Sequence, residues 1–270
     1  MKTIILIILI LLSISLVGLG YIESKPNSYD LKYNFDEGDV FAYDIVSSVE
    51  MPNKMVTPIN VDMNILDINN TSITVKKISM ETTPGNKIKK SHIETMTDQG
   101  EIIKLNSEDL ILPEIQPEVP NTIIYPENQI HQGESWTIPF KRANNLTTAG
   151  MLTIYELLGT NNYTCIGFKN VSVRAGSFEC VGIESDSNFT LNMVTKTSNG
   201  TVYTIITGKE SGKNWVDLNS GVLVKSEYDV DKVIKTDLSE IYEEIGLEKC
   251  YKETPIDSHI ISELVNFKEG

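Results

Sequence analysis

Short apolar runs with a period of two recur along the chain after Asp30, and this pattern restricts the fold more than any other feature. Such alternation places apolar side chains on one face of an extended strand. Gly, Asn, Asp or Pro bounds each run, as is typical of strands joined by turns. The pattern predicts a mainly β chain with a curved antiparallel sheet. We expect strands at residues 40–49, 61–68, 73–80, 88–97, 101–105, 136–140, 152–158, 163–168, 178–185, 189–196, 202–207, 214–218 and 222–230.

One stretch, residues 110–130, interrupts this pattern. It contains Pro113, Pro117, Pro120 and Pro126, and proline cannot donate a hydrogen bond to a sheet ladder. We expect a long crossover or a lid loop here. The same stretch could equally separate two halves of one sheet.

Two segments, residues 35–41 and 130–136, resemble each other. Each carries an apolar residue, then a glycine followed by an acidic residue, and finally an aromatic residue. A turn with the glycine at positive φ, leading into a strand, explains both segments. The similarity indicates either two related halves of the chain or two strand starts of the same kind.

The last stretch, residues 237–270, is predicted to be an acidic helical segment. Asp237 can cap a first helix, with Glu240 as its capping-box partner. A second helix would begin with Thr254 as its cap and Pro255 in its first turn. These helices would dock on the sheet or form a tail that binds a partner. The apolar stripe of the second helix consists of Ile256, Ile260, Ile261, Leu264 and Val265.

Residues 1–22 precede the β region with a basic start and a long apolar run. Small residues near its end permit cleavage, as in a signal peptide. The run is also near the length of about 20 residues that a membrane-spanning helix needs. The leader is therefore a signal peptide or an uncleaved membrane anchor. Either would place the chain on the extracellular side of the cell membrane, with residues 23–30 as a linker to one β domain at residues 31–236.

The acidic residues are spread along the chain, which has a formal net charge of −14. Nucleic-acid binding relies on clustered Lys and Arg, so this charge argues against nucleic acid as a partner. Solubility is the usual meaning of a negative charge that is spread out in this way. The hydrophobic content of 40% is ample for a packed core.

Export would expose the chain to disulfide formation and N-glycosylation. Cys165 and Cys180 flank a predicted strand–turn–strand segment, so they either form a disulfide or remain two buried thiols. Cys250 would be free or would link two chains. N-glycosylation triplets begin at Asn69, Asn70, Asn145, Asn162, Asn170, Asn188 and Asn199.

The sequence contains no motif with the spacing of a catalytic or metal site. The three histidines, His92, His131 and His259, lie far apart and lack a second ligand at zinc-site spacing. We therefore expect a protein that is not an enzyme and that has no cofactor and no metal. Trp136 and Trp215 lie at predicted strand starts, where they would face a ligand or fill the core.

Three segments resemble motifs of one group of exported proteins. Residues 171–180 resemble V-x-V-x-A-G-[ST]-F-[ED]-C, residues 133–136 resemble G-[DE]-S-W, and residues 215–225 resemble W-x-[DS]-x-x-x-G-x-[LV]-[VI]-K. These motifs are similar to those of exported proteins of unknown function related to the LolA and LppX lipoprotein carriers. The resemblance implies an incompletely closed antiparallel β-barrel. In the carrier members, the concave face holds an acyl chain or another apolar ligand.

Three functions are open at this point. The first is a non-enzymatic envelope protein, exported or membrane-anchored, that binds an apolar small molecule or lipid in its half-barrel. The second is a structural or protein-interaction module of the cell surface, with an envelope protein as its partner. The third is a hydrolase whose catalytic residues are scattered over the sheet. Because one fold serves many functions, only the geometry of a site can separate these alternatives.

Overall fold

The computed structural model describes residues 28–51, 53–69, 71–83, 85–107, 123–148 and 150–270. Most of these residues lie in antiparallel strands, so the mainly β prediction is confirmed. Eleven strands form one sheet, and two short strands form another. The strands are β1 (Ser28–Tyr29), β2 (Val40–Met51), β3 (Asn53–Asn69), β4 (Ser72–Thr83), β5 (Asn86–Met96), β6 (Ile102–Ser107), β7 (Ile130–His131), β8 (Ser135–Thr148), β9 (Met151–Val173), β10 (Gly176–Thr197), β11 (Gly200–Asp217), β12 (Leu223–Asp237) and β13 (Tyr251–Lys268).

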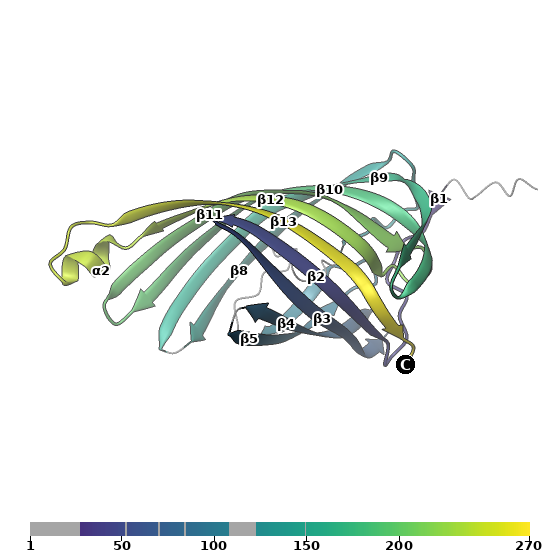
Figure 1. Ribbon diagram of the computed structural model, residues 1–270, viewed down its shortest axis with the longest axis horizontal. Coiled ribbons are helices and arrows are strands. Elements are labelled where there is room, and N and C mark those ends of the chain that lie inside the picture. The colour runs from purple at the N-terminus through teal and green to yellow at the C-terminus, as the bar shows by residue number, and fades with distance from the viewer. Residues whose placement is uncertain (1–27, 52, 70, 84, 108–122, 149) are drawn as a thin grey trace, which may run out of the picture.

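The large sheet consists of two meanders, β2 to β6 and β8 to β13, which are joined because β13 pairs with β2. The order across the sheet is β6-β5-β4-β3-β2-β13-β12-β11-β10-β9-β8. The sheet curls strongly, so that β4 and β5 lie below β10 and β12 in Figure 1. The prediction of a curved, incompletely closed barrel is confirmed, with β6 and β8 as its two outer strands.

β9, β10 and β11 are longer than predicted, because two predicted runs join in each of them. β10, for example, continues through the polar residues that separate its two apolar runs. The alternation persists there, since Asp186 and Asn188 are exposed whereas Ser187 between them is buried. Pairing with β9 and β11 persists as well. A buried serine does not register in a search for apolar residues, so the predicted strands ended too early.

The prediction of a second C-terminal helix is wrong. Residues 251–268 form β13, which lies between β12 and β2 in the middle of the sheet. Its inward face includes the buried Ser262, so the remaining apolar residues imitate a helical period. Pro255 is tolerated because it pairs with β12, while pairing with β2 begins at Asp257. The buried residues of this face are Ile260, Ser262 and Leu264.

The first C-terminal helix is present as α2 (Ser239–Glu244), but its predicted capping box is not. Asp237 accepts a hydrogen bond from the backbone N–H two residues later, at 2.9 Å. Glu240 instead accepts hydrogen bonds from the backbone N–H of Thr201 and the hydroxyl of Tyr203. The helix therefore docks on the start of β11.

The two similar segments ahead of β2 and β8 form the same turn. Gly38 and Gly133 have φ values of 94° and 85°. The acidic residue after each glycine, Asp39 or Glu134, accepts a hydrogen bond from the backbone N–H three residues earlier, at 2.9 Å in both cases. The predicted glycine turn leading into a strand is thus confirmed in both segments.

Residues 171–180, which resemble the exported-protein motif, form the end of β9, the turn at residues 174–175 and the start of β10. Arg174 in this turn contacts two strands that are distant in the chain. Its guanidinium lies 2.6 Å from the carboxylate of Asp44 on β2, and its backbone N–H donates to Glu263 on β13 at 3.1 Å. The motif therefore has a structural role, because it ties the hairpin to the junction of the two meanders.

Three glycines on the concave face lie under aromatic rings of a neighbouring strand. A Cβ atom at any of these glycines would lie 2.1–2.4 Å from a ring atom. The missing side chains let the rings lie against the sheet and favour its curvature. The pairs are Gly159 with Phe140, Gly208 with Phe189, and Gly212 with Tyr228.

The leader, residues 1–22, lies outside the described residues, and both predictions for it stay open. In the described part of the chain, no helix has the length and apolar character needed to cross a membrane. The end of the predicted linker, Ser28–Tyr29, pairs with β7 and is thus part of a small sheet.

Candidate functional site

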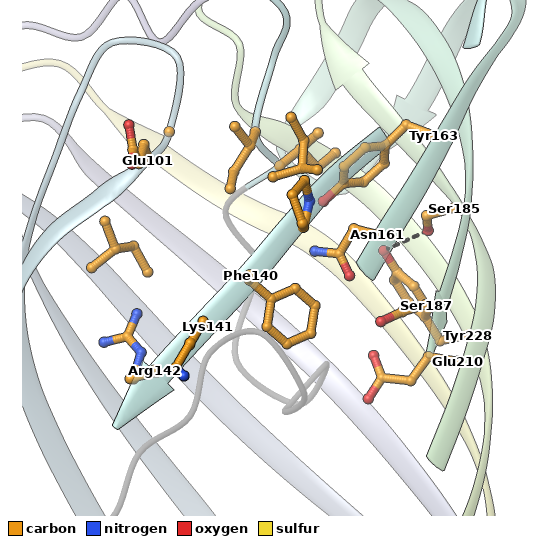
Figure 2. A pocket seen from close by; sticks show the side chains of 16 residues that line it. Glu101, Phe140, Lys141, Arg142, Asn161, Tyr163, Ser185, Ser187, Glu210 and Tyr228 are labelled. Atoms are coloured by element: carbon orange, nitrogen blue, oxygen red, sulfur yellow. Dashed lines mark hydrogen bonds between the residues drawn. The ribbon is translucent and has the colours of Figure 1, made fainter. Parts of the chain in front are cut away.

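A pocket of about 380 Å³ opens between β6 and β8, the two outer strands of the large sheet (Figure 2). Its lining comes from residues 100–102, from Ile123 and Ile124, from β8, and from the concave face of β9 to β12. Small-molecule sites typically measure about 300–1,000 Å³. The incomplete closure of the barrel therefore leaves room for a small ligand at this seam, and we call this cavity the seam pocket.

One wall of the seam pocket is apolar. It consists of Ile123 and Ile124, which belong to the described part of the proline-rich stretch, and of Ile138 and Phe140 from β8. The backbone N–H of Ile123 donates a hydrogen bond to the hydroxyl of Tyr33 at 2.9 Å. The described end of the predicted lid loop is thus a fixed, buried part of the barrel rather than a loose cover.

Trp136 was predicted to face a ligand or to fill the core, and it does not line the seam pocket. Its ring stacks on Tyr163 with centroids 5.2 Å apart, and its indole N–H donates to the carbonyl of Ile124 at 2.9 Å. Trp136 therefore positions the apolar wall, and it is partly buried against the core.

Trp215 was also predicted to face a ligand or to fill the core, and it does not line the seam pocket either. This residue follows the buried, inward-facing Asn214 on β11 and projects from the opposite face of the sheet. Its ring covers Gly182, where a Cβ atom would lie 2.6 Å from it, and the Lys169 ammonium lies 3.6 Å from the ring centroid. Trp215 is a packing residue of the convex face.

The opposite wall of the seam pocket is polar. Ser185, Ser187, Glu210 and Tyr228 line it from β10, β11 and β12, and all four are buried. The Tyr228 hydroxyl accepts a hydrogen bond from the side-chain amide of Asn214 at 2.7 Å. Burial raises the pKa of Tyr228, so its hydroxyl stays neutral at physiological pH.

Charges of both signs surround the seam pocket. The Glu210 carboxylate lies 4.0 Å from the ammonium of Lys232. Lys141 and Arg142 line the pocket from β8, and Lys141 also pairs with Glu156 at 2.9 Å. The pocket is therefore not dominated by charge of one sign.

None of the sequence motifs pointed to the residues of the polar wall. Ser185 and Ser187 belong to a period-two series that continues as Phe189 and Leu191, all of them buried on one face of β10. Small polar residues at the inward positions of such a series are the signal that a search for apolar residues overlooks. No sequence pattern marked Glu210 as a pocket residue, because the residues around it lie on other strands.

The predicted disulfide between Cys165 and Cys180 is wrong. Both cysteines are free and buried. Across the β9–β10 pair, Cys165 lies opposite Ile183, whereas Cys180 lies opposite Lys169. Residues four positions apart on a strand are separated by about 13 Å, whereas a disulfide needs Cα atoms within about 7 Å. Of the two predicted alternatives, a disulfide or two buried thiols, the structure has two buried thiols.

The predicted N-glycosylation residues are exposed wherever the structure describes them. Asn70 lies outside the described residues. The Asn69 side chain accepts hydrogen bonds from the turn that follows it, including the backbone N–H of Ser72 at 3.0 Å. Attachment of glycans stays a prediction. The exposed residues are Asn69, Asn145, Asn162, Asn170, Asn188 and Asn199.

A buried ion cluster lies on the inner face of β4 and β5. The ammonium of Lys77 lies 2.7 Å from one oxygen of Glu94, and the ring of His92 lies 3.4 Å from the other. Their side chains are 2%, 0% and 4% exposed in that order. Burial alone would raise the pKa of Glu94, but Lys77 and His92 oppose it and hold that pKa at about 2.

The depressed pKa of Glu94 predicts a loss of stability in acid. Its pKa of about 2 in the folded chain is lower than the ordinary 4.5, so its contribution is complete above pH 4.5 and is lost as the pH falls toward 2. A shift of this size corresponds to about 3 kcal/mol. Urea unfolding of the wild type and of Glu94→Gln at pH 6 and pH 2.5 measures it. We expect the difference between the two proteins to shrink in acid, and an unchanged difference would contradict this assignment.

The histidines do not converge on a site. His92 is buried on β5, His131 ends β7, and His259 on β13 contacts Asp229 at 2.8 Å. None of them lines the seam pocket. Among the described residues, no three His, Cys, Asp or Glu side chains are grouped as metal ligands.

Comparisons with known proteins identify no family. No family model matches the chain, and no curated protein matches it. The chain is similar to the crystal structure of a candidate exported protein with a YmcC-like fold from Bacteroides fragilis, at 12% identity and a TM-score of 0.37, over 89% of this chain and 100% of the other. A candidate lipoprotein from Parabacteroides distasonis gives 14% identity and a TM-score of 0.37, over 89% and 99%. Because both TM-scores are low, neither similarity indicates what this chain binds.

Proposed function

We propose that this protein is a non-catalytic binding protein that holds a small amphiphilic molecule in the seam pocket. The observation that carries the proposal is the division of the pocket into two walls. Ile138 and Phe140 form the apolar wall together with Ile123, and the buried Ser187 and Glu210 belong to the polar wall. An apolar chain gains about 25 cal/mol for each Å² that it buries, while the polar wall supplies partners for a head group.

The packing of the barrel limits the size of the ligand in this proposal. Aromatic side chains fill the interior away from the seam, where Phe41 stacks on Phe267 at 4.8 Å and Tyr33 lies 5.1 Å from Tyr125. The proposed ligand therefore occupies the seam pocket alone. The resemblance to lipoprotein carriers supports an apolar ligand, but the space favours a short chain over a long one.

Export is part of the same proposal. The basic start and apolar run of residues 1–22 support delivery across a membrane, with the β domain on the extracellular side. The ligand would then be a component of the cell envelope or of the surrounding medium.

An acidic side chain in the apolar wall is expected to abolish binding. Ile138→Asp places a carboxylate where the chain of an amphiphile would lie, and burying such a charge is strongly unfavourable. Calorimetric titration of the full chain with octyl glucoside, octanoate and octylammonium should show saturable binding of at least one of them. We expect Ile138→Asp to weaken that binding at least tenfold.

The matched control is Ile154→Asp, because Ile154 is 44% exposed on the outer face of β9. This variant should bind as the wild type does. Organic extraction of the purified protein, followed by mass spectrometry, should also release an amphiphile. An empty extract together with no binding of any octyl compound would end the proposal.

A protein-interaction module is the second candidate function. The observation that favours it is a row of apolar side chains on the outer face, formed by Tyr203, Val194 and Ile154 on three adjacent strands. Tyr203 and Ile154 are both 44% exposed. Cross-linking on intact cells would capture a partner on this row, and recovery of monomer alone would count against it.

A further inference from the structure

We propose, building on the proposed function, that the polar wall of the seam pocket recognises a neutral, hydroxyl-bearing head group such as a sugar or another polyol. The amphiphile would place this head against Ser187 and Glu210 and its apolar chain against Phe140. In Figure 2, the Ser187 hydroxyl and the Glu210 carboxylate point toward the Phe140 ring across the cavity.

The Ser187 hydroxyl is the first observation that points to a ligand. The residue is 8% exposed and lines the pocket, yet its hydroxyl has no hydrogen-bond partner among the described residues. A buried polar group without a partner costs about 1–3 kcal/mol, so native structures rarely keep one without a reason. A ligand hydroxyl would satisfy this group as either donor or acceptor.

Polar side chains lie next to Ser187 on the two adjacent strands. Asn161 and Glu210 are its direct partners in the sheet register, on β9 and β11, and both line the pocket. An amide, a hydroxyl and a carboxylate thus lie in one row on the concave face. Together they offer donors and acceptors to a group that itself carries both, as a polyol does.

The charges around the row favour a neutral head group over a charged one. An anionic head would meet the Glu210 carboxylate, which is 4% exposed. A cationic head would meet Lys141 and Arg142, which line the pocket. Like charges at such short range in a partly dry site repel strongly. A hydroxyl donates to the carboxylate without bringing a charge of its own.

Three ligands with the same chain and different heads separate these chemistries. Octyl glucoside, octanoate and octylammonium are titrated calorimetrically into the full chain below their micelle concentrations. The same titrations into Ile138→Asp serve as the blank for binding outside the seam pocket. We expect octyl glucoside to bind at least tenfold more tightly than the two charged compounds.

Two variants of the polar row test the head-group contacts. Ser187→Ala should weaken octyl glucoside about threefold to tenfold, the range for one lost hydrogen bond. Glu210→Gln should weaken it tenfold or more, because hydrogen bonds to a charged group are stronger. Ser187→Ala should not change any residual binding of octanoate by more than twofold, whereas Glu210→Gln should strengthen it, because the repelling carboxylate is then absent.

Ser262→Ala is the matched control. Ser262 is 1% exposed on β13, and its hydroxyl also lacks a hydrogen-bond partner within the described part of the chain, but it does not line the pocket. This variant should leave all three affinities unchanged. An equal loss with Ser187→Ala and Ser262→Ala would overturn the assignment, as would tighter binding of octylammonium or octanoate. In those last two cases the binding pocket itself would still stand, whereas no binding of any compound would remove both proposals.

Discussion

Replacing Lys77 by methionine is expected to lower the free energy of unfolding by about 4 kcal/mol. Methionine keeps most of the volume of the side chain but removes the charge that lies 2.7 Å from the Glu94 carboxylate. The carboxylate is fully buried, so it loses its closest cation without gaining water. Breaking a buried ion pair by removing one partner typically costs about 3–5 kcal/mol.

Urea unfolding at pH 7, followed by circular dichroism, measures this effect. Lys141→Met is the matched control, because Lys141 pairs with Glu156 at 2.9 Å while 66% of its side chain is exposed. An exposed pair of this kind contributes about 1 kcal/mol or less. The double variant Lys77→Met/Glu94→Met should lose less stability than Lys77→Met alone, since no uncompensated carboxylate is then buried. Equal losses for Lys77→Met and Lys141→Met would show that burial does not strengthen this pair.

The Gly221→Ala variant is expected to lose about 4 kcal/mol as well, for a steric reason. Gly221 has a φ of 71°, and a Cβ atom there would lie 2.3 Å from the carbonyl oxygen of Lys32. The left-handed conformation costs an alanine about 1–2 kcal/mol, and overpacking against a fixed backbone adds about 1–3 kcal/mol. The hydroxyl of Tyr125 also donates to the Gly221 carbonyl at 2.9 Å, so the change would disturb the segment that leads away from the seam pocket.

Gly246→Ala separates the two contributions. Gly246 has a φ of 76°, but a Cβ atom at this position would contact nothing within 4 Å. Its loss should therefore be about 1–2 kcal/mol, from the backbone conformation alone. Thermal unfolding of both variants gives the comparison. If Gly221→Ala and Gly246→Ala lose the same stability, the close approach of the Lys32 carbonyl to residue 221 does not contribute to the loss.

The strands and turns follow from residues that are neighbours in the chain. Alternating apolar residues predicted the strands of both meanders except β13, and the glycine turns at Gly38 and Gly133 were predicted from seven-residue segments. These features depend on local backbone preferences and on the two-residue period of a strand. They were therefore within reach of a single sequence.

The prediction failed where inward positions are polar. Ser187 on β10 and Ser262 on β13 are buried because both neighbouring strands and the curl of the sheet enclose them. A prediction that expects every inward-facing residue to be apolar ends β10 too early and assigns a helix to the residues of β13. The seam pocket was missed for the same reason, since its polar wall consists of such residues.

Local order along the chain was enough to establish the antiparallel strands, the turn glycines and the mainly β class. The pairing of β13 with β2, the burial of Lys77 beside Glu94, and the meeting of Ser187, Asn161 and Glu210 across three strands required the folded sheet. These contacts join residues that are distant in the chain. Their register depends on the summed packing of the whole curled sheet, which no short segment of sequence contains.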